Sequence, residues 1–294
     1  MTRTTKDIVE PLFREAKKAP FRIAPEREEE LSREIFGANK WELNSAEGEA
    51  QLYALPQDGT VSVSNAAMAS LWNLSFAAFH IMDVATRARR AEPSGKTFFD
   101  VGRELSQLNV RAHVDYARSL CSVDKEWPDE LPLPNTSAKP NTAEWRVNNI
   151  FYGALSWILL HEIGHLHLKH EKLIPADERI RDEYAADEFA TKWVLDDAGN
   201  GLLREFRVLM VAVAFAWLFL KEAGPGTGKD HPPAIVRFRE AIEHFEVGAR
   251  SVGIECAGYL FKAIFDPATP PPAFDTPSEQ FDWVSRRLEE LFPR

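Results

Sequence analysis

The segment from Ile150 to His165 constrains the fold of this chain more than any other. Eleven mainly apolar residues, 150–160, run directly into the sequence His161-Glu162-Ile-Gly-His165. Residues four apart on a helix project from the same face, so these two histidines can bind one metal ion together. Apolar surroundings would shield such a site from bulk water and strengthen its electrostatics. We therefore expect a buried helix here.

Glu162 adds a chemical role to this pair of histidines. Its carboxylate can reach a metal-bound water without binding the metal, which is the arrangement that a zinc hydrolase needs for its general base. A structural zinc site has no use for such a carboxylate. The alternatives are a chance match and a histidine pair with a purely structural role, and the apolar stretch before the motif argues against both.

A zinc site of this kind needs a third protein ligand and an open position for water. Glu183 follows His165 by eighteen residues, within a helical stretch, 176–197, that can pack antiparallel against the first helix after a turn near Pro175. Asp187 lies four residues further on and shares the same face. We predict that Glu183 is the third ligand and that Asp187 accepts a hydrogen bond from the outer nitrogen of a ligating histidine. The alternative is a solvated acidic helix face.

Three further histidines and one arginine lie near the motif or after it. His167 and His170 lie about 200° and 140° around the helix from His165, so we expect them to point away from the metal and to lie at the surface or in a layer behind the ligands. His231 follows a glycine-rich loop, and the proline after it holds it out of helical geometry. We predict that His231 stabilises the oxyanion, with a simple helix start as the alternative. Arg237 is a second candidate for that role or for fixing the loop.

Turn-forming residues organise the N-terminal half. The residues Pro56-Gln-Asp-Gly59 separate two short strand-like runs, 51–55 and 60–64, and predict a hairpin. The run 60–64 is either a sheet edge that receives an extended peptide by main-chain pairing or part of the core. Helical character is expected over 6–18, 25–36, 65–90, 98–120, 144–172, 176–197 and 202–223.

The segment 126–143 is expected to be a long surface loop, because four prolines among polar residues cannot continue a helix. This loop either divides the chain or covers a cleft. We expect a single domain over 1–294. Its N-terminal half of helices and strands covers about 1–125, and its catalytic helical half covers 144–294. The predicted fold class is α+β and predominantly α-helical, with a small β element before the active-site helices.

Charge and composition narrow the class of partner. The chain has 35 Lys and Arg against 45 Asp and Glu, a formal charge of −10, which argues against a nucleic-acid partner or a polybasic membrane anchor. The longest apolar run, Val208 to Leu220, falls short of the roughly 18 residues of a membrane span. The N-terminus shows no signal-peptide pattern, and Cys121 and Cys256 are the only cysteines. We expect a cytoplasmic protein that acts on a protein or peptide substrate.

The sequence His161-Glu-Ile-Gly-His165 followed by Glu183-Tyr-Ala-Ala-Asp187 resembles the gluzincin class of zinc metallopeptidases, whose pattern is HExxH followed by ExxxD. The whole chain is similar to the phage-exclusion Lit peptidase family in its length, in the place of the motif, and in a Val-Ser-Val-Ser strand before a helix containing Leu71-Trp72. The resemblance implies a zincin-like fold, with zinc held by His161, His165 and Glu183. It also implies a protease that cuts elongation factor Tu during phage infection and so blocks protein synthesis.

These residues predict an intracellular zinc endopeptidase, and three alternatives stay open. A regulator-cleaving peptidase of the ImmA and IrrE type shares HExxH and a later Glu-x-x-Ala-Asp-x-Phe-Ala pattern, which Glu183 to Ala190 match only with altered spacing. A deformylase also uses HExxH, but its cysteine ligand stands in a Gly-Cys-Leu setting that Cys121 lacks. A non-catalytic metal-binding regulatory protein is the third alternative, and the intact Glu162 argues against it.

Overall fold

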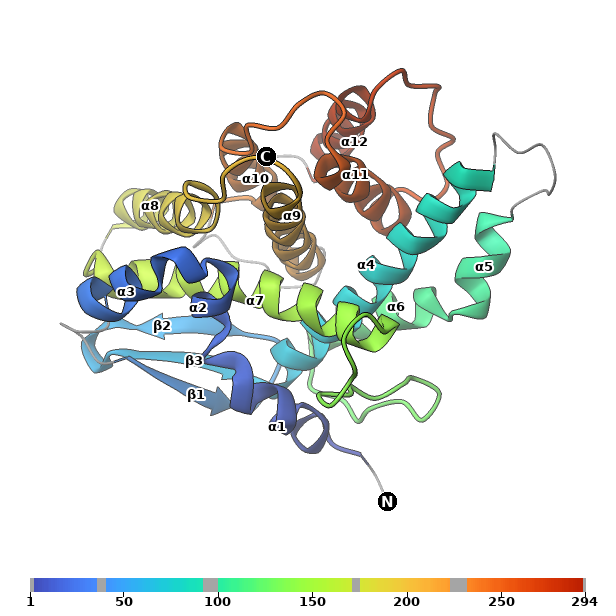
Figure 1. Ribbon diagram of the computed structural model, residues 1–294. Coiled ribbons are helices and arrows are strands. Elements are labelled where there is room, and N and C mark those ends of the chain that lie inside the picture. Colours follow the sequence, from blue (N-terminus) through green and yellow to red (C-terminus); the bar gives the residue numbers. More distant parts are fainter. Residues whose placement is uncertain (1–2, 36–40, 92–99, 171–174, 223–231, 293–294) are drawn as a thin grey trace.

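A computed structural model describes residues 3–35, 41–91, 100–170, 175–222 and 232–292. The protein is predominantly helical with one small sheet, which confirms the expected α+β class (Figure 1). Helix α7, Ala143–His167, runs between this sheet and helices α8 and α9. Within the described residues, no helix combines the length and apolarity that crossing a bilayer would require.

The sheet has three strands, β1 Glu42–Ala46, β2 Leu52–Leu55 and β3 Thr60–Ser64, in the order β1-β3-β2. β3 pairs antiparallel with β2, which confirms the predicted hairpin, and parallel with β1, which the sequence analysis missed. The hairpin turn ends at Gly59, whose φ of 63° favours glycine. Because β3 is the central strand, it is not the sheet edge; β2 is the outer strand on the side of α7.

Helix α7 begins and ends differently from the predicted range 144–172. Thr142 caps its first turn by accepting a hydrogen bond from the backbone N–H of Trp145. The helix is buried along most of its length, as expected from the apolar stretch. It stops at His167, because Lys169 adopts a left-handed conformation with φ of 58° and reverses the chain.

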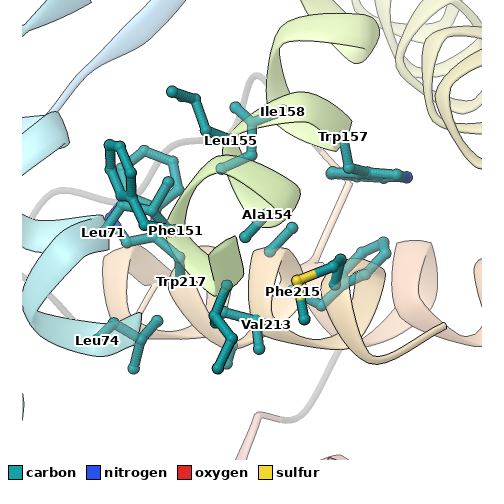
Figure 2. Close-up of a cluster of buried hydrophobic side chains, with 14 of the residues drawn as sticks. Leu71, Leu74, Phe151, Ala154, Leu155, Trp157, Ile158, Val213, Phe215 and Trp217 are labelled. Atoms are coloured by element: carbon teal, nitrogen blue, oxygen red, sulfur yellow. The ribbon is translucent and has the colours of Figure 1, made fainter. Parts of the chain in front are cut away.

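The core lies where α7 crosses α4, Asn65–Ala91, and α9, Leu202–Glu222 (Figure 2). Aromatic and aliphatic side chains from all three helices meet there, including Leu71 of α4 and Trp217 of α9. Gly153 lets α9 approach closely, since a Cβ at this position would lie 2.5 Å from the side chain of Met210. The apolar run in α9 is therefore a buried core segment, as predicted.

The remaining helices surround this centre. Their bounds are α1 Thr5–Ala16, α2 Ala19–Ile23, α3 Glu28–Glu30, α5 Val101–Gln107, α6 Val110–Leu120, α8 Ala176–Leu195, α10 Ala234–Glu243, α11 Val252–Phe265 and α12 Pro277–Leu291. Two predicted helices were wrong as single units. The range 25–36 is broken into a 3-10 turn, α3 and a π turn, and the range 98–120 divides into α5 and α6 at Asn109, whose φ is 53°.

Candidate metal centre and active site

Two adjacent helices bring three metal-binding side chains together. His161 and His165 lie one turn apart on α7, with their Nε2 atoms 3.2 Å apart. Glu183 of α8 faces them, and its carboxylate oxygens lie 3.6 Å from His161 Nε2 and 3.5 Å from His165 Nε2. Ligand atoms of the three residues all lie within 4.8 Å of one another. This group can bind a metal ion, and its members are the three predicted ligands.

Small residues allow α8 to lie this close to α7. A Cβ on Gly164, inside the motif, would lie 3.3 Å from Ala186 Cα and 3.1 Å from a ring carbon of Phe189. Ala186 and Ala190 are fully buried at the contact. The short side chains therefore determine the helix separation, and that separation determines how far Glu183 stands from the histidines.

Asp187 lies beside the first histidine, where the sequence analysis expected a carboxylate partner. Its Oδ1 lies 2.9 Å from His161 Nδ1. Arg237 of α10 holds the same carboxylate with two hydrogen bonds of 2.6 and 2.7 Å and lies 3.5 Å from Glu183. Burial would raise the pKa of Asp187, but the guanidinium outweighs it and lowers that pKa below its usual value. Arg237 therefore lies behind the candidate ligands, and its single positive charge partly offsets the charges of Asp187 and Glu183.

The second histidine also has a partner on its outer side, His170. His170 Nδ1 lies 2.8 Å from His165 Nδ1, because the chain reversal at Lys169 returns the ring to the helix end. The sequence analysis assumed a continuous helix, so it did not foresee this contact, but His170 is not placed as a ligand, because its ring lies against the outer nitrogen of His165. His167 does point away, and its ring packs against Phe189.

These hydrogen bonds test whether a metal ion fits the three ligands. If His161 donates its Nδ1–H to Asp187 and His165 donates its Nδ1–H to His170, both Nε2 lone pairs face each other at 3.2 Å. A shared proton or a metal ion satisfies that arrangement. In the protein without metal, burial opposes a charged His161, yet the hydrogen bond to Asp187 raises its pKa. Burial and the charge of His161 lower the pKa of His165 to about 3. The donor set fits a divalent cation that replaces this proton.

Glu162 lies next to the ligands and against the sheet. Its side chain is buried, and the backbone N–H of Ala54 in β2 lies close enough to favour the ionised carboxylate. Burial, reinforced by the charge of Glu183, raises the pKa of Glu162 to about 7, although His161 and Lys221 act in the opposite direction. A carboxyl group whose pKa lies near neutral pH is suited to taking and returning a proton. The contact with Ala54 had no signal in the sequence, because it joins residues far apart in the chain.

The predicted oxyanion residue His231 lies outside the described residues. The helix that follows it, α10, begins at Ala234 and supplies Arg237. The alternative role of Arg237 at the oxyanion is not favoured, since its guanidinium contacts Asp187 and Glu183.

A buried histidine-histidine-carboxylate group beside a second carboxylate defines a candidate metal-dependent hydrolase centre. The comparison with known families agrees with a hydrolase of peptides: the chain belongs to the Peptidase U49 family, whose model matches residues 61–257. The matched region contains all the residues of the candidate centre. No solved structure shows significant similarity.

One curated relative is the cell death peptidase of Escherichia coli strain K12. It is 28% identical over 128 residues, which is 42% of this chain and 42% of the relative. The alignment therefore spans less than half of either protein. Family membership relates the chain to peptidases.

Proposed function

We propose that this protein is a zinc-dependent endopeptidase of the gluzincin type that acts in the cytoplasm. The observation that carries the proposal is the convergence of His161, His165 and Glu183, with the buried Glu162 beside them. Three protein ligands leave a position open for water, which distinguishes a catalytic zinc site from a closed structural one. Zinc and a zincin-like fold are parts of the proposal, supported by this donor set and by the α7–α8 arrangement.

The chain's own residues supply the proton transfers. Bound zinc would lower the pKa of its water towards about 7 and polarise the peptide carbonyl. Glu162 takes a proton from the attacking water at its carboxylate and later delivers it to the leaving amine. Asp187, held by Arg237, keeps the lone pair of His161 Nε2 directed inward.

The outer edge of β2 is the proposed place for the substrate main chain. Ala54 directs its backbone N–H towards Glu162, so this edge faces the metal centre. An extended peptide that paired with β2 would pass directly beside the base and the ligands. The preference would then be for a flexible segment of a protein substrate.

The proposed substrate is a translation factor, with elongation factor Tu as the first candidate, and the proposed setting is phage exclusion. The name of the Escherichia coli relative, a cell death peptidase, supports an activity that stops the growth of the cell. The resemblance to the Lit peptidases is the reason for proposing a translation factor as the substrate.

The test compares new protein N-termini across the proteome in cells expressing wild type, Glu162→Gln or His161→Ala, with and without phage infection. Glu162→Gln should keep its zinc, measured by mass spectrometry of the metal. Its turnover should fall about 10²- to 10⁴-fold. His161→Ala should lose both. A dominant cut in a translation factor that disappears in both variants would support the proposal. Retained cleavage by Glu162→Gln would contradict it.

A further inference from the structure

We propose that His170 is a positioning residue that fixes the metal ligand His165, and that Asp182 in turn fixes His170. The inference rests on the proposed metal centre. It assigns a role to two side chains that the proposed mechanism does not use.

The end of α7 is built to return the chain towards His165. The backbone N–H of His170 donates to the carbonyl of His165 at 3.0 Å, and that of Lys169 donates to the carbonyl of Leu166 at 3.3 Å. These two bonds are the Schellman pattern of a helix C-terminus. The pattern needs a left-handed residue after the helix, and Lys169 occupies that position with φ of 58°, where glycine is usual. The turn holds His170 in place through backbone bonds.

One arrangement of hydrogens agrees with both contacts of the His170 ring. His170 Nε2 lies 3.4 Å from a carboxylate oxygen of Asp182, so a hydrogen on this nitrogen would face the acid. His170 Nδ1 is then an acceptor, and it receives the Nδ1–H of His165 at 2.8 Å. That hydrogen bond leaves the lone pair of His165 on Nε2, where it faces His161 and Glu183.

The same geometry excludes His170 as a fourth ligand. Its Nδ1 contacts the outer nitrogen of His165, on the side of the ring opposite to Nε2, and its Nε2 faces Asp182. Both ring nitrogens are therefore directed away from the metal position.

The two ligand histidines are thus held by different devices. His161 is oriented by a carboxylate, Asp187, which a buried arginine neutralises. His165 is oriented by a neutral imidazole, whose side chain is 12% exposed. Asp182 immediately precedes Glu183 on α8, so the support for the second ligand and the third ligand itself belong to the same helical turn. A shift of α8 would disturb both together.

The experiment measures zinc affinity by competition with a chromophoric chelator in wild type, His170→Ala, His170→Asn and the control His167→Ala. Removing an outer partner of a ligand is expected to weaken zinc binding about 10- to 100-fold in His170→Ala. The amide oxygen of asparagine can accept the same hydrogen bond, so His170→Asn should stay within about threefold of wild type. His167 packs against Phe189, and its substitution should leave zinc affinity unchanged.

A second readout follows the tautomer of His165 directly. Nitrogen NMR of the imidazoles in the metal-free protein should show His165 protonated at Nδ1 in wild type, and a mixture of tautomers in His170→Ala. Equal zinc affinity and an unchanged tautomer in His170→Ala would overturn the inference. If wild-type protein and His161→Ala bind zinc equally weakly, the proposed function fails instead, and the tautomer alone decides whether His170 positions His165.

Discussion

At the scale of single residues, Glu162 has surroundings that disfavour its charge. The carboxylate is buried beside Glu183, and the pKa of about 7 expresses the cost of keeping it ionised there. As the proposed base, Glu162 must nevertheless be ionised to accept a proton. Without a metal, the protein therefore carries a destabilising charge at the position where the proposed chemistry requires one, a compromise between stability and activity that is common at active sites.

The stability of the metal-free protein should report this cost. The carboxyl pKa rises from 4.5 to about 7 on folding, so between these pH values the folded state holds more protons, and the free energy of unfolding falls as pH rises. In a chelator, Glu162→Gln should therefore be more stable than wild type by about 3 kcal/mol at pH 8. The gain should shrink to under about 1 kcal/mol at pH 5. Urea unfolding at both pH values checks this, and an equal gain at both would show that Glu162 is not buried as a charge.

At the scale of secondary-structure elements, the distance between α7 and α8 sets the geometry of the ligands. Gly164→Ala would press a methyl group against the backbone of Ala186, where little room exists. We expect a loss of about 1 to 3 kcal/mol in the free energy of unfolding, because α8 must shift. Zinc affinity should fall as well, since Glu183 moves with the helix.

Urea unfolding and chelator competition measure these two effects. Gly248→Ala is the matched control, because a Cβ there meets no atom within 4 Å, and its effect should stay within about 0.5 kcal/mol. A stable Gly164→Ala protein with normal zinc affinity would contradict the proposed role of the close contact.

The turn after α7 gives a second prediction at this scale. Lys169 has φ of 58°, which strains a residue with a side chain, so Lys169→Gly should raise the free energy of unfolding by up to about 1 kcal/mol. Leu168, one residue earlier, has the ordinary helical φ of −79°, and Leu168→Gly should lower stability by about 1 kcal/mol. Thermal unfolding separates the two outcomes, and stabilisation by both substitutions would argue against strain at Lys169.

Sequence-based prediction succeeded where helix geometry is local and failed where the chain departs from it. The spacing of His161 and His165, and that of Glu183 and Asp187, follow from the helical repeat, so their common faces could be predicted. His170 could not be placed, because a lysine gives no sign of a left-handed turn. Strand β1 was missed because its mostly polar residues show no apolar alternation, and its pairing with β3 is decided by contacts outside the segment.

At the scale of the whole molecule, buried contacts fasten the N-terminal helices to the catalytic half. Glu26 forms a two-fold ion pair with Arg207 of α9, whose side chain is fully buried. Arg27 stacks over the ring of Trp193 in α8, 3.8 Å from its centre. These contacts favour the expected single domain, in which the two halves unfold together.

Calorimetry of Glu26→Gln tests this view of the domain. We expect one transition in both wild type and variant, with the variant destabilised by about 2 to 4 kcal/mol, because the charge of the buried Arg207 loses its partner. Glu10→Gln is the control, since its pair with Arg14 is exposed and its loss should cost less than about 1 kcal/mol. Two separate transitions would mean that the halves are independent domains.

The place of Arg237 also decides when the centre can form during synthesis. A ribosome releases the chain from its N-terminus, so α7 and α8 emerge with all three ligands before α10 exists. Until Arg237 arrives, the carboxylates of Asp187 and Glu183 have no buried arginine to neutralise them. The nascent chain is therefore expected to gain its ordered centre only near the end of translation, which is a useful delay for an enzyme proposed to attack the translation machinery that makes it.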